Sequence, residues 1–317
     1  MPSFIIPTEN RPDLAVGLTR STLPGAAQFI APKLFPAFRV AEKGGKIACA
    51  QRVVATGTKN REAGAAHASQ RVANFDVEYA TDTYEGSAYL TDRDIKDHGG
   101  IDPAINAAKI AAAYGAVKLY EKDAAALVFS SARYTAASTI DADAPFDAFA
   151  GAALAVKHYG EPVLVASETW LRNFVKLPKV VETLRALYGD GWFKYIADLS
   201  NVNDAIGQAF GVKRVLIGDD DFWAVENRTD AAAVVALRPN EMAAGVVQTV
   251  KAVPCYGFAP TFLPESSAGL DEPFSVSTVF RDATRDNAVD VTLDAVPKEI
   301  NAAAAKLVKL PAAQAGG

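Results

Sequence analysis

Two acidic clusters in this sequence contain residue types that could hold a metal ion. The aspartates at 219–221 follow an apolar stretch that predicts a strand, and carboxylates at the carboxyl end of such a strand can bind Mg²⁺. Asp92, Asp94 and Asp97 resemble the start of a calcium loop. The sixth and twelfth positions of such a loop need Gly and Glu, but here they hold Asp97 and Pro103. Because no phosphate-binding loop or basic partner is nearby, we interpret both clusters as solvated turns and predict no metal site.

The other candidates for chemistry are scattered along the chain. Its only histidines, the usual acid–base residues near neutral pH, are His67, His98 and His158. Its two cysteines, Cys49 and Cys255, have no partner motif, so we interpret them as buried small hydrophobic residues. No dinucleotide, P-loop, zinc-protease or nucleophile-elbow motif occurs. The sequence therefore predicts no catalytic residue and no cofactor, and an α/β enzyme built on the histidines and the acidic turn is an alternative.

Composition limits the class of protein. Half of the 317 residues are hydrophobic, enough for a sizeable core, and the formal net charge of −5 gives no overall basic field for tight nucleic-acid binding. Two isolated cysteines do not form a disulfide scaffold, so we expect a reducing cytoplasm. The N-terminal residues do not have the pattern of a signal peptide, and no run of about 18 apolar residues predicts a membrane span.

Residues 102–130 predict one long helix around which the other elements must be arranged. Asp102 is a good N-cap, Pro103 suits the first turn, and apolar residues recur at steps of three, four and seven. Such a helix is about 43 Å long, longer than a small domain is wide. It is rich in alanine, so other elements can approach its backbone closely, and Gly115 is its weak point. The pattern alone fits the core helix of an ordinary enzyme equally well.

The chain before this helix is extended. Six prolines in residues 1–40 prevent a long helix, and the apolar residues among them indicate an arm that lies on its own subunit or on a neighbour. Residues 46–54 and 71–81 predict the two limbs of a ribbon, the second with alternating apolar and acidic side chains. The stretch between them, 56–70, is small and polar. We interpret the ribbon as an interface element, because its edges would otherwise be open.

The chain after the helix alternates between helices and strands. The predicted helices are 147–159, 168–188 with an interruption at Pro178, and 203–210. The predicted strands are 162–167, 212–217, 246–253, 274–280 and 289–293, followed by a short helical segment over 298–310. We expect the three tryptophans to anchor the core or an interface, namely Trp170, Trp192 and Trp223.

The order of these parts is similar to that of a known family. Arm, ribbon, long helix, α/β part and returning strands resemble the major capsid proteins of tailed bacteriophages, whose Hong Kong 97-like (Johnson) fold is also used by encapsulin shells. PVLVASETWLRNFVKLPKV resembles the strand and helix with which the family's axial domain starts. AIGQAFGVKRVLIGDD resembles a later helix and strand of that domain, and AVPCYGFAPTFL resembles the strand that leaves it.

The resemblance implies an α+β fold with four parts. These are an N-terminal arm (1–40), an extended β-hairpin loop (41–75), a peripheral domain (76–133 and 246–317, with the spine helix at 102–130) and an axial domain (134–245). Some relatives cross-link through a lysine of the extended loop. Lys59 lies there, but no matching asparagine and carboxylate can be identified, so we do not assign that chemistry.

The implied function is self-assembly. Subunits would join through pentamers and hexamers into an icosahedral shell that encloses double-stranded DNA with weak contacts, in a virion assembled in the bacterial cytoplasm. Further expected partners are a scaffolding, portal or decoration protein. We expect no contact with a membrane. An encapsulin-like compartment for cargo protein is the alternative with the same fold. The candidate subunit-interface residues are Phe29, Phe35, Lys59, Arg61, Phe75 and Tyr79.

Overall fold

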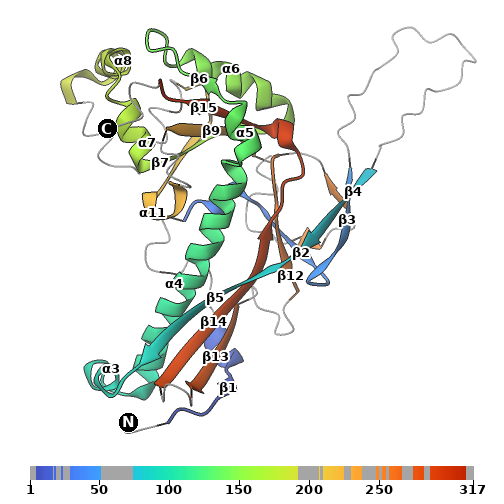
Figure 1. Ribbon diagram of the computed structural model, residues 1–317, viewed down its shortest axis with the longest axis vertical. Helices are drawn as coiled ribbons and strands as arrows, with labels where there is room; N and C mark the ends of the chain where they lie inside the picture. The colour runs from blue at the N-terminus through green and yellow to red at the C-terminus, as the bar shows by residue number, and fades with distance from the viewer. Residues whose placement is uncertain are drawn as a thin grey trace, which may run out of the picture.

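A single long helix, α4 (Ile101–Val128), runs along the molecule and has a sheet near each end (Figure 1). The computed structural model describes residues 5–16, 18, 23, 29–50, 74–191, 207, 210–224, 230–237, 248–249, 252–254, 257–265, 274–281 and 286–311. The predicted long helix is therefore confirmed. Its N-cap is Gly100 rather than Asp102, because Gly100 has a φ of 152° that other residues rarely adopt.

A seven-stranded sheet lies against the N-terminal part of α4. Its strands are β1 (Glu9–Asn10), β2 (Ala37–Val40), β5 (Asp82–Leu90), β10 (Gln248–Thr249), β12 (Thr261–Pro264), β13 (Phe274–Arg281) and β14 (Asp286–Pro297). The long strand β14 pairs antiparallel with β5, β13 and β12, so residues far apart in the sequence form one sheet. The predicted strands at 274–280 and 289–293 are confirmed, and the second is longer than expected. Within the range 246–254, the described residues form β10 and β11 (Ala252–Pro254), which pair with β2 and β3 (Gly44–Ala50) respectively.

The helix has no single buried face. Its buried residues recur about every four positions, and they are Ala104, Ile105, Ala108, Ala112, Ala113, Ala116, Val117, Tyr120, Glu121, Ala124, Ala125 and Val128. A step of four residues passes a full turn by about 40°, so the buried stripe moves around the helix axis. The stripe faces β5 and β14 first, and toward its C-terminal end it reaches elements from other parts of the chain.

Helix and sheet are in direct backbone contact at one point. A Cβ atom placed on Gly86 of β5 would lie 1.8 Å from the carbonyl oxygen of Ala112 and 2.9 Å from the amide nitrogen of Ala116. On the helix, a Cβ on Gly115 would lie 3.6 Å from the Cα of Gly86. Glycine on the strand and small residues on the helix thus set the distance between the two layers.

Two tyrosines add polar ties between α4 and the sheet. The Tyr84 hydroxyl on β5 donates a hydrogen bond to Asp123 Oδ2 at 2.9 Å, and its ring meets that of Tyr120 edge-on, with centroids 5.8 Å apart. The Tyr120 hydroxyl lies 2.5 Å from Thr261 Oγ1 of β12. Burial, together with the negative charge of Asp123, raises the pKa of Tyr84.

A second, five-stranded sheet lies at the other end of α4. Four of its strands come from 134–245, the range expected to be the axial domain, but the fifth comes from the C-terminal range 246–317, which was expected to belong to the peripheral domain. The strand order of the sheet is β6 (Ser138–Thr139), β15 (Ala305–Lys309), β9 (Ala231–Leu237), β7 (Glu161–Ser167) and β8 (Arg214–Gly218). Only β7–β8 and β15–β6 are parallel pairs. Helices α6 (Asp147–Val156), α7 (Glu168–Phe174), α8 (Pro178–Tyr188) and α11 (Asp220–Trp223) accompany this sheet (Figure 1).

Several predictions for this region are confirmed, one is wrong, and one strand was not predicted. The helices at 147–159 and 168–188 and the strands at 162–167 and 212–217 are present, with the expected break at Pro178. Most of 203–210 lies outside the described residues. The segment 298–310 forms no α-helix. It has a single 3-10 turn, and Ala305–Lys309 pairs with β9 in a sheet that buries its apolar residues. The central strand β9, AAAVVAL, was missed although all seven of its residues are buried.

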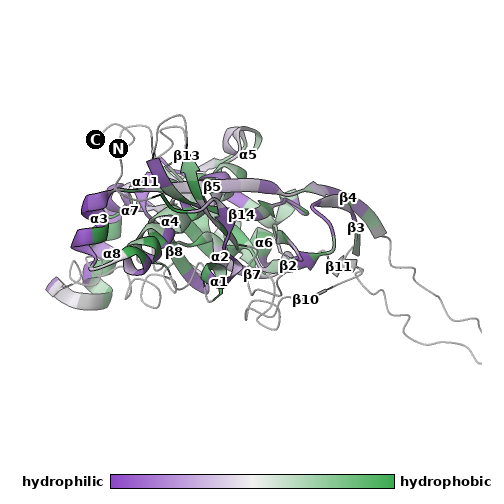
Figure 2. Ribbon diagram, turned by 90° about the horizontal axis from the view of Figure 1, so that it is seen from below, coloured by the Kyte–Doolittle hydropathy of each residue, from purple (hydrophilic) through white to green (hydrophobic). Residues whose placement is uncertain are grey.

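The predicted ribbon is present at its base. Strands β3 (Gly44–Ala50) and β4 (Asn74–Ala80) pair antiparallel, and β11 adds to β3 in parallel. A small separate core fixes this base to the body, and its buried members are Phe38, Val40, Ile47, Cys49, Val77, Phe262 and Ile300. Figures 1 and 2 show β3 and β4 projecting away from the two sheets.

The remaining elements are short. They are α1 (Pro12–Ala15), α2 (Ala31–Leu34), α3 (Asp92–Asp97), α5 (Ser131–Thr135), and the 3-10 turns η3 (Lys157–Tyr159), η4 (Gly189–Gly191) and η6 (Ala302–Ala304). Among the described residues, no helix is long and apolar enough to span a bilayer.

The backbone contact at Gly86 predicts the effect of a single methyl group. We expect Gly86→Ala to lower the free energy of unfolding by about 3 kcal/mol or more, because the overlap is with backbone that cannot rotate away. Gly151→Ala on α6 is the matched control, since a Cβ there has nothing within 4 Å; it should stabilise by about 0.5–1 kcal/mol. Chemical denaturation of both variants measures the difference, and equal stabilities would contradict this packing.

The raised pKa of Tyr84 predicts alkaline sensitivity. Above the ordinary tyrosine pKa of 10.0, the unfolded chain loses a proton that the folded chain keeps, so stability present below that pH is lost as the pH rises. We expect Tyr84→Phe, which has no proton to lose, to show a smaller fall in unfolding free energy between pH 9 and 11. Parallel losses in the two proteins would show that Tyr84 does not cause this sensitivity.

Candidate functional site

The most highly connected polar group in the described structure is the carboxylate of Glu121 on α4. Its side chain is fully buried. Its oxygens accept hydrogen bonds from the Ala31 amide at 3.1 and 3.2 Å, the Ile30 amide at 3.3 Å and Trp223 Nε1 at 2.8 Å. Ile30 and Ala31 belong to the N-terminal arm at the start of α2, and Trp223 belongs to α11. One carboxylate therefore joins the start of α2, the long helix α4 and α11.

Aromatic packing surrounds this junction. The ring of Phe29 lies 5.4 Å from Tyr114 of α4 and 5.9 Å from Phe222 of α11, measured between centroids. The ring of Trp223 meets Phe129 edge-on at 6.4 Å. The low polarity of this shell strengthens the hydrogen bonds to Glu121, because water does not compete for them.

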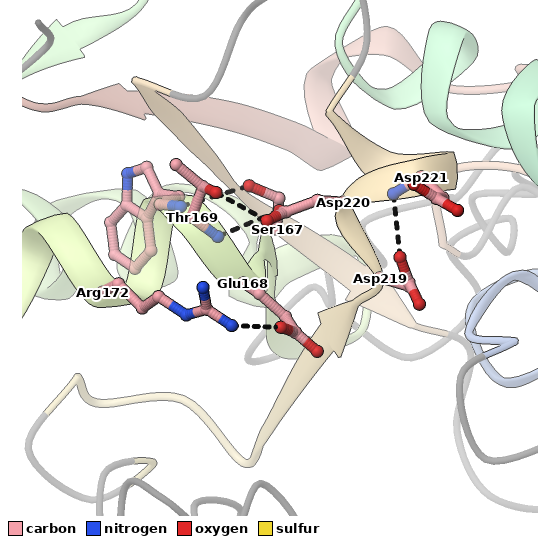
Figure 3. Close-up of polar contacts among 8 residues, drawn as sticks. Ser167, Glu168, Thr169, Arg172, Asp219, Asp220 and Asp221 are labelled. Atoms are coloured by element: carbon pink, nitrogen blue, oxygen red, sulfur yellow. Dashed lines mark hydrogen bonds and ion pairs between the residues drawn. The ribbon is translucent and has the colours of Figure 1, made fainter. Parts of the chain in front are cut away.

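The acidic turn at 219–221 lies at the carboxyl ends of the parallel strands β7 and β8 (Figure 3). Its carboxylates are engaged with nearby backbone and side chains. Asp220 accepts hydrogen bonds from the Thr169 amide at 2.9 Å and the Thr169 hydroxyl at 2.5 Å, and Asp219 accepts from the Asp221 amide at 2.8 Å. This arrangement caps α11 and ties it to the start of α7, as expected of a structural turn.

The neighbouring side chains in this turn have similar local roles. Ser167 caps α7 by accepting from the Trp170 amide at 3.2 Å, and Glu168 pairs with Arg172 one turn later (Figure 3). Within the described residues, no group of three or more His, Cys, Asp or Glu side chains could hold a metal ion.

The other residues considered for chemistry are not brought together. His98 follows α3 and His158 lies in η3, and both are exposed. Figure 1 shows α3 at one end of α4 and α6, the helix that leads into η3, at the other end. His67 and Cys255 lie outside the described residues. Cys49 is fully buried, as predicted. In the second acidic cluster, Asp94 forms a capping box with Thr91 at the start of α3.

The candidate interface residues occupy different environments. Phe29 and Phe35 are 2% and 1% exposed, so they belong to the core of their own subunit and present no surface to a neighbour. The arm was expected to lie on its own subunit or on a neighbouring one. At Phe29 and Phe35 it packs on its own subunit. On the ribbon, Phe75 is 37% exposed, and Tyr79 is half-buried with its ring 5.0 Å from Phe262.

Lys59 and Arg61 lie outside the described residues. At the base of the ribbon, the ion pair between Lys46 and Glu78 at 2.8 Å is on the surface, with both side chains more than half exposed. The described part of β4 thus offers a mixed apolar and charged surface. Of the tryptophans, Trp170 and Trp223 are buried in the core, and Trp192 is not among the described residues.

Sequence reasoning missed Glu121, although a signal was present. Val117, Glu121, Ala124 and Val128 share one helical face, and a single carboxylate among small apolar residues on a buried face requires hydrogen-bond partners. Those partners come from positions about 90 and 100 residues away, which no local pattern indicates.

Solved structures of other proteins have the same fold as this chain. No protein-family model matches the sequence, and no curated protein matches it significantly. Among solved structures, a phage-related protein from Bordetella bronchiseptica RB50 is 17% identical, with a TM-score of 0.60 over 94% of this chain and 95% of that chain. The structure of a virus-like particle from Pyrococcus furiosus is 13% identical, with a TM-score of 0.52 over 90% and 93% of the two chains.

A chain of Mycobacterium phage Bobi is 12% identical, with a TM-score of 0.51 over 93% of this chain and 95% of that chain. All three likenesses extend over nearly the whole length of both proteins. The chain therefore has the Hong Kong 97-like fold that the order of its parts implied.

The hydrogen bonds of Glu121 generate a stability prediction. Glu121→Leu leaves three buried donors without this acceptor, so we expect the free energy of unfolding to fall by about 2–5 kcal/mol. Glu121→Gln keeps one acceptor oxygen and should lose less. Glu85→Gln is the control. The Glu85 side chain on β5 is exposed, so this variant should change the free energy of unfolding by less than about 0.5 kcal/mol. If denaturation shows Glu121→Leu to be as stable as the control, the junction does not hold the arm and α11 as described.

Proposed function

We propose that this protein is a major capsid protein that assembles through pentamers and hexamers into an icosahedral shell around phage DNA. The observation that carries the proposal is the likeness of fold over nearly the full chain to a phage-related protein and to a phage structure. A third structure of this fold belongs to a virus-like particle. The proposed location is the virion, after assembly in the host cytoplasm.

The shape of the subunit supports self-association. The β3–β4 ribbon projects from the body, and Phe75 on one face of β4 and Glu78 on the other are both exposed. A projecting element on one copy that meets a different surface on the next is a heterologous contact, which closes into rings when the rotation allows. We assign Phe75 and Tyr79, with Lys59 and Arg61 from the sequence, to this contact.

The charge balance is consistent with enclosed DNA. A formal net charge of −5 gives the subunit no overall attraction for a polyanion, so packaged DNA would be held with weak contacts. Scaffolding, portal or decoration proteins are further proposed partners. The same fold would also suit a shell that encloses cargo protein.

The contents of the particles distinguish the two kinds of shell. We expect particles purified from phage-producing cells, after external nuclease treatment, to have an absorbance ratio at 260 and 280 nm typical of nucleic acid. A ratio typical of protein, together with a second protein that copurifies inside the particles, would contradict the DNA assignment and support a cargo compartment.

The ribbon contact predicts a separation of folding from assembly. Deleting residues 56–70 should leave the thermal unfolding temperature of the subunit unchanged, because the buried contacts at the base of the ribbon remain. The deletion should abolish the large species seen by analytical ultracentrifugation. Replacing the same residues with a Gly/Ser stretch of equal length tests whether side chains or length matter. Normal particles from both variants would show that this segment is not an assembly contact.

A further inference from the structure

A cavity lies where the chain crosses between the two sheets. Its volume is about 360 Å³, at the lower end of the range of small-molecule sites. One wall is the connection from α4 into α5, and the other is the return from β14 through η6 into β15. Figure 1 shows α5 and β15 close together at the end of α4. The cavity therefore lies between the two connections that join the peripheral and axial parts.

The cavity contains a charged side chain that the fold has nearly buried. The Arg133 side chain is 10% exposed, and its guanidinium lies 4.6 Å from the centre of the Phe258 ring. It donates to the Ala302 carbonyl at 3.2 Å and pairs with Glu299 on the opposite wall. Its Nε is buried with no hydrogen-bond partner among the described residues. The buried Nε is out of reach of the cavity, but a guanidinium has five N–H donors and the terminal nitrogens use only two of theirs on Ala302 and Glu299. The remaining terminal N–H groups can donate to a water or an anion.

A second cation lines the same cavity. Lys306 on β15 is exposed, and no carboxylate of the described chain lies within ion-pair distance of it. Since Glu299 compensates Arg133, the charged residues that line the cavity leave one positive charge unbalanced. The remaining walls are largely apolar, because five of the nine lining residues are alanine or leucine.

We propose that this cavity binds a short aliphatic carboxylate. The carboxylate would lie between Lys306 and the terminal N–H groups of Arg133 that Ala302 and Glu299 do not use, and the aliphatic part would lie against the alanine walls. One unbalanced charge and apolar walls suit a singly charged amphipathic anion better than inorganic phosphate, which carries more charge and needs more donors. The ligand could be a free short-chain acid or the carboxyl terminus of a peptide, since both present the same chemistry.

The test uses the full-length protein and butyrate as the probe. We expect a saturation-transfer NMR titration to show butyrate binding with a dissociation constant on the order of 1 mM. Butylamine, which has the same size and the opposite charge, and inorganic phosphate should not bind at the same concentrations. N-acetyl-alanyl-alanine, which imitates the carboxyl terminus of a peptide, distinguishes the two possible ligands. If it binds more tightly than butyrate, the ligand is a peptide terminus, and if it binds more weakly, the ligand is a free short-chain acid.

Matched charge reversals locate the site. Lys306→Glu should weaken butyrate binding about tenfold or more, because it removes a charge-assisted contact and adds a repulsive charge. Lys157→Glu makes the same change in net charge at an exposed lysine outside the cavity and should bind like the wild type. Absence of wild-type binding, equal loss in both variants, or equal binding of butylamine would overturn the proposal. None of these outcomes depends on whether the subunit forms a shell.

Discussion

The described structure depends on one buried carboxylate and the requirement that it be satisfied. Burying a charge is expensive unless hydrogen bonds replace its water, so the position of Glu121 is tolerable only while the arm and α11 both donate to it. The preceding residue of the helix, Tyr120, contacts Thr261 of β12 in the seven-stranded sheet. Two consecutive side chains on α4 therefore connect segments that are distant in the sequence. Removing either side chain would leave the buried polar groups of its partners unpaired.

The second constraint is the thinness of the long helix. Alanine at most buried positions and glycine on the facing strand bring helix and sheet into backbone contact, so little side-chain volume lies between them. Because the buried stripe moves around the helix axis, the same helix packs on the seven-stranded sheet at one end and beside α11 and α2 toward the other. A strict 3.6-residue repeat would keep one face buried and would not connect the two regions in this way.

The sequence revealed much of the fold because its strongest signals are local. The long helix, the break at Pro178, the apolar strand before Ser167 and the alternation of β4 all follow from spacing and from residue type. The errors have a physical cause. The segments Ala231–Leu237 and Ala305–Lys309 are rich in alanine and lysine, which favour helix locally, and they become strands only because they pair with each other in a buried sheet.

The site was less predictable than the fold. Phe29 and Phe35 were recognised as apolar residues that must be covered, but sequence could not decide whether their own helix or a neighbour covers them. Glu121 needed partners that only the tertiary structure supplies. The cavity beside Arg133 depends on two connections that are more than 150 residues apart, so no local pattern could indicate it.

The central claim is that this fold builds a shell, and electron microscopy of the purified protein tests it most directly. Negative-stain images should show closed particles of uniform diameter, or rings of five and six subunits that close into particles on further incubation. A species that remains a monomer or dimer at all concentrations examined, with its fold intact, would contradict the account and return attention to the enzyme alternative.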